Sequence, residues 1–253
     1  MNVGTNNATR TNHQLRTCAT PEEVAFSAAD IFEEQSATAI ARKGQFRVAL
    51  SGGSTPKRTY QLLAHRASQI DWEHIHIFWG DERYVPADDP QSNFRMTAEA
   101  LLDHVPIPAT NVHRVRTELD SPETAARAYE NDIRQSFGAT SDIPRFDLAF
   151  LGLGSNGHTA SLFPHSPLLE EHDRIVAADF IGEAKMWRIT MTAPLLNAAL
   201  MVVFLVAGPD KAEIVREVIS GPRNVQRLPA QLIQPKSGGL LWILDESAAK
   251  LVR

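Results

Sequence analysis

Short, continuous apolar runs recur along the chain, and they constrain its fold more than any other feature. Runs without alternating polar residues are typical of a parallel sheet that helices cover on both faces. Segments with helical patterns lie between the runs, as that arrangement requires. The sequence therefore predicts an α/β fold with a three-layer, doubly wound, mostly parallel sheet. Strands are expected at residues 46–50, 75–79, 112–115, 147–151, 188–191, 201–206 and 240–244.

Capping signals mark where several helices begin and end. The segment 20–23 combines a threonine N-cap, a proline at the first helical position and a capping-box glutamate. It predicts a helix that runs to about Arg42, before Gly44. Further helices are expected from Ser121-Pro122 to Phe137 with Gly138 as the stop, from Thr55 as cap with Pro56 at the first position, from an opening segment at 91–94, and over 210–218.

The chain has 253 residues, and it shows neither an internal repeat nor a low-complexity linker. Residues 20–253 are therefore expected to form a single α/β catalytic domain. Residues 1–19 are expected to be a disordered tail. Their lack of acids, together with Arg10 and Arg16, also faintly resembles an organelle transit peptide.

Composition narrows the possible partners. The formal net charge of −5 gives no long-range attraction to nucleic acid or to an anionic membrane, so neither is expected as a partner. No apolar run approaches the ~20 residues of a membrane-spanning helix. The single cysteine, Cys18, excludes an internal disulfide and fits a cytoplasmic location. We expect a small-molecule partner and a monomer or weak homodimer.

The segment 151–164 follows an apolar run and brings glycines, small polar residues and His158 into one turn. Glycines let backbone N–H groups approach a ligand. A neutral imidazole at the carboxyl end of a strand can accept a proton near pH 7. The segment therefore predicts a reaction site with His158 as the base, and the alternative is that His158 only caps a following helix.

A second loop, 51–56, leaves a predicted strand and enters a helix. Its glycines expose backbone N–H groups, its hydroxyls add donors, and the helix dipole favours an anion there. The spacing differs from the nucleotide-binding glycine motifs, so a phosphate cradle is expected rather than a nucleotide site. A well-capped glycine-rich turn is the alternative. The expected phosphate-binding residues in this loop are Ser51, Gly52, Gly53, Ser54 and Thr55.

Three cations are candidates to hold an anionic substrate. The planar guanidinium of Arg83 can bind a phosphate with two hydrogen bonds, while Asp81 and Glu82 could support it or orient hydroxyls. Arg188 lies on a predicted strand, and Lys211 lies in the first turn of a predicted helix. Both are expected near the edge of the sheet where the other loops begin. Each of these charges could instead be an ordinary surface group.

Metal dependence is not expected. Four carboxylates at positions 81, 82, 88 and 89 lack the ordered spacing of a calcium loop. His74 and His76 share one face of a predicted strand without a third plausible ligand nearby. We therefore expect neither a metal nor another cofactor.

Together these segments resemble the 6-phosphogluconolactonases over most of the chain. The matching motifs are Ser-Gly-Gly-Ser-Thr-Pro at 51–56, Gly-Asp-Glu-Arg at 80–83 with Ser92-Asn93, the glycine-histidine segment within 152–164, Arg-Ile-Thr at 188–190, and the lysine at 211. The resemblance implies the fold shared by sugar-phosphate isomerases and CoA transferases. It also implies hydrolysis of 6-phosphoglucono-δ-lactone in the pentose phosphate pathway.

One position departs from the family pattern. The family usually has an aspartate immediately before the Gly-His pair, and this chain has Asn156. Asparagine keeps the hydrogen bond but loses the charge that raises the basicity of an imidazole. The related glucosamine-6-phosphate deaminases have that aspartate and a glutamate where Phe163 stands here. The deaminase or an isomerase is therefore the weaker alternative.

Each candidate residue has an expected role in lactone hydrolysis. His158, with Asn156, would activate water, and Gly52, Gly154 and Gly157 would donate backbone N–H groups to the oxyanion. Ser161 would support the site with the two acids, and an acyl-enzyme on Ser161 is the minor alternative. A non-catalytic sugar-phosphate sensor is a further alternative, but residues 1–19 are too short for a helix-turn-helix.

Overall fold

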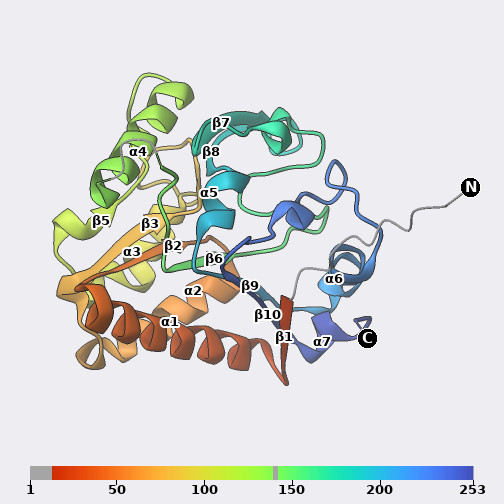
Figure 1. Ribbon diagram of the computed structural model, residues 1–253, viewed down its shortest axis with the longest axis horizontal. Coiled ribbons are helices and arrows are strands. Elements are labelled where there is room, and N and C mark those ends of the chain that lie inside the picture. The colour runs from red at the N-terminus through yellow and green to blue at the C-terminus, as the bar shows by residue number, and fades with distance from the viewer. Residues whose placement is uncertain (1–12, 139–141, 253) are drawn as a thin grey trace, which may run out of the picture.

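The computed structural model describes residues 13–138 and 142–252, and their main element is one large sheet (Figure 1). Every strand pair in it is parallel. The predicted α/β fold with a mostly parallel sheet is thus confirmed. In spatial order the strands are β1 (His13–Cys18), β10 (Gly239–Asp245), β9 (Met201–Val206), β6 (Leu148–Leu151), β2 (Phe46–Leu50), β3 (Ile75–Trp79) and β5 (Val112–His113).

Helices cover both faces of this sheet, as Figure 1 shows. One face is covered by α1 (Pro21–Lys43), α2 (Ser54–His65) and α3 (Asn93–Ala100), and the other by α4 (Pro122–Phe137), α5 (Ala193–Ala198) and α6 (Ala212–Ser220). A short α7 (Glu246–Ala249) follows β10. Alternate residues of one strand enter opposite cores, because side chains alternate along a strand. In β2, Val48 and Leu50 pack toward α1 and α2 while Ala49 packs toward α4.

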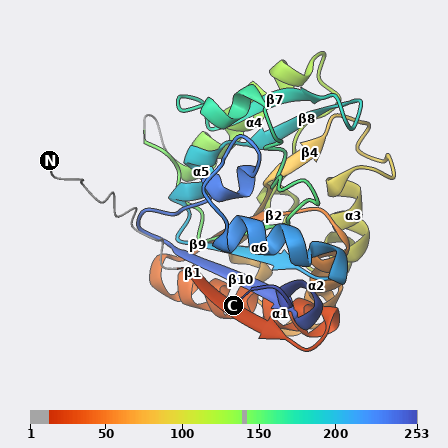
Figure 2. The ribbon, with the colours of Figure 1, turned by 90° about the vertical axis from the view of Figure 1, so that its right-hand side faces the viewer.

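A second, antiparallel sheet lies on the face of the large sheet opposite to α1 (Figure 2). Its strands, in spatial order, are β4 (Asp81–Arg83), β8 (Met186–Met191) and β7 (Val176–Ile181). Two expectations are corrected by this sheet. The strand predicted at 188–191 belongs to this small antiparallel sheet and not to the large parallel one. The segment 81–83, expected as a loop, is a strand. A three-residue, wholly charged segment has no apolar pattern that predicts pairing.

Most predicted helix ends are confirmed. Thr20 and Ser121 accept the backbone N–H three residues later, and Gly44 and Gly138 end their helices at φ 77° and 61°. The start of α2 is different, because Gly53 is the N-cap and Thr55 lies inside the first turn. The helix expected over 210–218 is divided into a 3₁₀ turn at Pro209–Lys211 and α6.

The N-terminal prediction is wrong for residues 13–18, which form β1 and pair in parallel with β10. The side chains of 14–17 are exposed, so this edge strand lacks the apolar run that marks the inner strands. Residues 1–12 of the expected tail lie outside the described residues. Over the part of the chain that the structure describes, no helix is long and apolar enough to cross a membrane.

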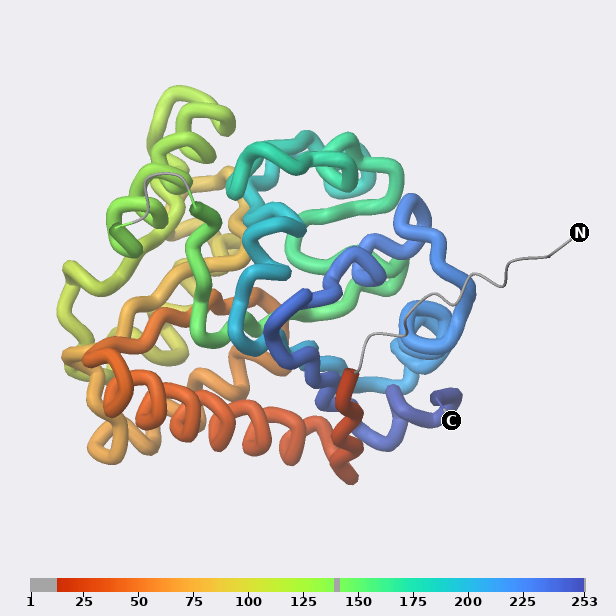
Figure 3. The backbone as a smooth tube through the Cα atoms, viewed as in Figure 1, coloured from red at the N-terminus to blue at the C-terminus, as the bar shows by residue number. Residues whose placement is uncertain are grey.

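The strand order places two of the predicted site loops beside each other. On one side of β2 the sheet continues in space with β3 and β5. On the other side it continues with β6, β9, β10 and β1. Ligands of such sheets collect beyond the carboxyl ends of the strands at this switch point. The loops after β2 and β6 both start there. Figure 3 shows that the chain after β6 runs irregularly before it reaches β7.

Candidate active site

His158 lies in the irregular connection after β6. The next element is the 3₁₀ turn Pro167–Glu170, nine residues further on, so His158 caps no helix and the helix-capping alternative is wrong. The imidazole is half-buried and stacks on Phe163 with ring centroids 4.0 Å apart. It also lies directly against the backbone of Gly154. A Cβ at position 154 would be 2.0 Å from Cε1 and Nδ1 of the ring, so only glycine leaves room for the imidazole there.

Asn156 determines which ring nitrogen of His158 carries the proton. Its Oδ1 lies 2.6 Å from Nδ1 of His158 and also accepts the His158 backbone N–H at 3.2 Å. Its Nδ2 donates to Oε2 of Glu183 at 3.1 Å. An amide oxygen can only accept, so neutral His158 is protonated at Nδ1 and keeps its lone pair on Nε2. Glu183 had no sequence motif to mark it.

Burial and nearby charges keep this imidazole neutral. Burial is the largest effect and lowers the pKa of His158 to about 4, while the charge of Asp81 raises it. The charges of the other three predicted site groups, Arg188, Lys211 and Arg83, lower it further. The imidazole therefore lies among one carboxylate and three cations, and it is a proton acceptor at pH 7.

The small sheet brings two arginines together. Arg83 on β4 lies directly opposite Arg188 on β8, and Asp81 lies opposite Thr190. Residues two apart along a strand share a face, so all four belong to one face. Like charges in opposite positions repel, which favours an anion between them. In the described part of the chain, the buried Nε atoms of both arginines have no hydrogen-bond partner.

Asp81 connects the loops around this face. Its Oδ2 accepts the Ser161 hydroxyl at 2.6 Å and lies 3.9 Å from Arg188 Nη1. The backbone N–H of Ser161 donates to Thr190 at 3.2 Å. The Ser161 hydroxyl is thus committed to a carboxylate and positions the loop, which argues against Ser161 as a nucleophile.

Glu82 points to the other face of β4. Its carboxylate accepts backbone N–H groups from Arg83, Asn93 and Phe94 and the hydroxyl of Ser92. Ser92 is the N-cap of α3, so the carboxylate stabilises the start of that helix. Burial raises the pKa of Glu82. Glu82 therefore holds the backbone beside Arg83, and its oxygens are occupied by these donors rather than by a substrate.

The loop after β2 has the geometry of an anion cradle. A Cβ on Gly52 would be 2.0 Å from Asn93 Oδ1, and Gly53 has φ 113°, so both positions require glycine. Among the described residues, the N–H groups of 52–55 make no backbone hydrogen bond. The hydroxyl of Ser51 is buried and likewise has no partner there.

Two buried tyrosines hold the backbone at the points where the chain leaves β2 and β3. No sequence pattern marks either tyrosine. The Tyr60 hydroxyl accepts the Ser51 N–H at 3.0 Å and donates to the Ser51 carbonyl at 2.8 Å. The Tyr129 hydroxyl bridges the N–H and carbonyl of Trp79 in the same way, at 2.7 and 3.0 Å. Each hydroxyl replaces sheet hydrogen bonds where a strand ends.

Two of the three expected oxyanion donors make hydrogen bonds within their own loop. The Gly154 N–H donates to the His158 carbonyl at 2.9 Å, and the Gly157 N–H donates to the Gly154 carbonyl at 3.0 Å. These bonds shape the turn around the imidazole, and Gly157 has φ 84°. Of the predicted donors, Gly52 keeps an N–H that bonds to no described backbone acceptor.

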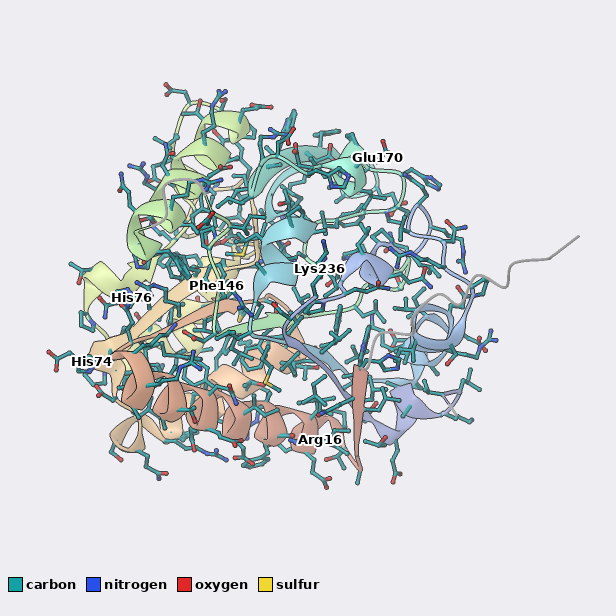
Figure 4. The ribbon with its side chains drawn as sticks, viewed as in Figure 1. Arg16, His74, His76, Phe146, Glu170 and Lys236 are labelled. Atoms are coloured by element: carbon teal, nitrogen blue, oxygen red, sulfur yellow. The ribbon has the colours of Figure 1, made fainter. Side chains whose placement is uncertain are left out.

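The remaining groups considered in the sequence are Lys211, which lies just before α6, and His74 and His76, which lie just before and within β3. Lys211 ends the 3₁₀ turn before α6, with Nζ 3.7 Å from Asp210 Oδ2. His74 pairs with Asp71, and His76 contacts His113. Figure 4 shows His74 and His76 on the side of the molecule opposite to Glu170, which ends the 3₁₀ turn at 167–170. The residues that the structure describes contain no cluster of three metal-ligating side chains.

Comparisons with known proteins identify the family of the chain. The family described as glucosamine-6-phosphate isomerases/6-phosphogluconolactonase matches residues 19–242. A 6-phosphogluconolactonase of Synechocystis sp. is 47% identical over 216 residues, which are 85% of this chain and 88% of that protein. One from Haemophilus influenzae is 39% identical over 81% of this chain and 87% of its own length.

Solved structures show the same relationship. A 6-phosphogluconolactonase from Trypanosoma cruzi superposes with a TM-score of 0.88 at 29% identity, covering 97% of this chain and 99% of that one. A monomeric glucosamine-6-phosphate deaminase shares the fold, with a TM-score of 0.80 at 23% identity over 94% of this chain and 99% of that one. The chain therefore belongs to the family of glucosamine-6-phosphate isomerases and 6-phosphogluconolactonases.

Proposed function

We propose that this protein hydrolyses 6-phospho-D-glucono-1,5-lactone to 6-phosphogluconate, the second step of the oxidative pentose phosphate pathway. The observation that carries the proposal is an imidazole whose Nδ1 is held by Asn156 and which lies, beside Asp81, among three cations at the carboxyl edge of the sheet. A site that hydrolyses a phosphorylated ester needs a base to activate water and cations to bind the phosphate. The relatives named 6-phosphogluconolactonase support the choice of lactone.

The phosphate end of the substrate would bind the cations. Arg83 and Arg188 lie opposite each other and present buried Nε groups without partners among the described residues. A phosphate between them forms charge-assisted hydrogen bonds and removes their mutual repulsion. The cradle at 51–55 and Lys211 add donors. This assignment accounts for a pair of cations that would otherwise be unfavourable on one sheet face.

The lactone end would lie beside His158. Nε2 takes a proton from water as the water oxygen bonds to the lactone carbonyl carbon, a contribution of roughly 10²- to 10⁴-fold. The Gly52 N–H stabilises the oxyanion. When the bond from that carbon to the ring oxygen breaks, Nε2 returns the proton to the ring oxygen. The products are a free hydroxyl and a carboxylic acid, which releases its proton to solvent to give the carboxylate, and the neutral imidazole is restored.

The deaminase alternative has less support at the site. Phe163 stacks flat on His158 where a glutamate is expected in the deaminases. The likeness to the solved deaminase shows the fold alone. A non-catalytic sensor would not need the protonation state that Asn156 imposes on His158.

The test is a lactone hydrolysis assay with subtraction of the spontaneous rate, run beside a glucosamine-6-phosphate deaminase assay. We expect enzyme-dependent hydrolysis that saturates with the phosphorylated lactone and no ammonia release. Ammonia release without lactone hydrolysis would replace the lactonase with the deaminase. Binding of 6-phosphogluconate without either activity would indicate a sensor.

A further inference from the structure

Glu183 lies outside every motif of the sequence, yet it completes a chain of hydrogen bonds that ends at the imidazole. It belongs to the turn that joins β7 to β8, in which the N–H groups of Ala184 and Lys185 bond back to Ile181 and Gly182. This turn carries the Glu183 carboxylate to Asn156, 27 residues earlier in the chain. The contact therefore depends on the small sheet and on no local sequence pattern.

The direction of each hydrogen bond follows from the groups involved. A carboxylate only accepts, so the Asn156 Nδ2 donates to Glu183 Oε2 at 3.1 Å. The Asn156 Oδ1 must then face His158 and accept from Nδ1 at 2.6 Å. A negative charge at one end of the amide polarises it and strengthens the bond at the other end.

We propose that Glu183 is a positioning residue that acts through Asn156, so that Glu183, Asn156 and His158 together do the work of a direct carboxylate–histidine pair. The amide orients the imidazole, and the carboxylate supplies the charge that the amide lacks. The inference rests on the proposed function, because it concerns the basicity of the same Nε2.

Charges on both sides of the ring set the basicity of His158. The other ionisable groups that act on it are Asp81, which favours the protonated imidazole, and Arg83, Arg188 and Lys211, which oppose it. In the proposal, Glu183 adds a second favourable charge on the Nδ1 side; its side chain is exposed, so this charge acts through the hydrogen bond to Asn156 rather than through burial. An aspartate at position 156 would instead place two carboxylates in contact, where they repel each other.

The experiment uses four variants of the full chain: Glu183→Gln, Asn156→Asp, the double variant, and Glu34→Gln as a control that removes one exposed carboxylate from α1. With Asn156 in place, Glu183→Gln is expected to lower kcat about threefold to tenfold with KM little changed. In the Asn156→Asp background, the same substitution is expected to raise kcat about threefold, because it relieves the repulsion. Glu34→Gln is expected to leave kcat unchanged.

A second readout does not depend on turnover. In ¹⁵N NMR titrations, Glu183→Gln should have a lower pKa of His158 than the wild type. The double variant should have a higher pKa of His158 than the wild type, because an aspartate then contacts Nδ1 directly. An unchanged pKa of His158 in Glu183→Gln would overturn the inference, as would a change in kcat of the same sign in both backgrounds. A protein without lactonase activity would refute the proposed function, and the titration would still decide whether Glu183 acts on the imidazole.

Discussion

Gly154→Ala tests the position of the imidazole by a single methyl group. The added Cβ would lie 2.0 Å from Nδ1 and Cε1 of His158, and 2.8 Å from Cγ. Ordinary contacts between such atoms are about 3.5 Å, so the ring must move by about 1.5 Å or rotate away. A misplacement of about 1 Å can reduce turnover 10²-fold. We therefore expect kcat to fall about 10²-fold.

The chain supplies a matched control two residues earlier. A Cβ on Gly152 has no neighbour within 4 Å, so Gly152→Ala adds the same methyl group to the same loop without a contact. Both variants should keep near-normal thermal unfolding, since the collision involves one half-buried side chain. The assay is background-corrected lactone hydrolysis. Equal kcat values for the two variants would refute the placement of His158 against Gly154.

Three further predictions test other parts of the site. Arg83→Ala should raise KM for the phosphorylated lactone much more than for the unphosphorylated one, and equal losses in steady-state kinetics would remove Arg83 from the phosphate site. Tyr60→Phe leaves the buried N–H and carbonyl of Ser51 without partners, which should cost about 1–3 kcal/mol of unfolding free energy and raise KM more than it lowers kcat. An unchanged KM would show that the hydroxyl does not shape the cradle. Because folding lowers the pKa of His158 from 6.5 to about 4, stability present above pH 6.5 should be lost as the pH falls toward 4. Urea unfolding at pH 7 and 5 should show the wild type losing about 1–2 kcal/mol more than His158→Gln, and parallel losses would contradict the burial of a neutral imidazole.

The sequence predicts the inner strands well, because full burial on both faces leaves an apolar run. The strands at 46–50, 75–79 and 201–206 were predicted with the bounds that the structure shows. The edge strand at 13–18 and the strand at 81–83 have exposed or charged side chains. Their pairing is decided by distant partners.

The site shows the same division. The segments that carry His158, Arg83 and the cradle could be found from glycines and charges that follow predicted strands. Tyr60, Tyr129 and Glu183 could not, because each acts through a contact that only the folded chain creates. The hydrogen bonds that the N–H groups of Gly154 and Gly157 make within their loop could not be predicted for a related reason. A glycine motif indicates that N–H groups are accessible in a turn and does not indicate which carbonyls they meet.

The most direct test of the account is the turnover number of His158→Ala on 6-phosphoglucono-lactone, measured with the spontaneous rate subtracted. If Nε2 takes the proton from water, kcat should fall at least ~10²-fold while KM changes little. A turnover number equal to that of the wild type would contradict the account, because no base would then be needed at position 158.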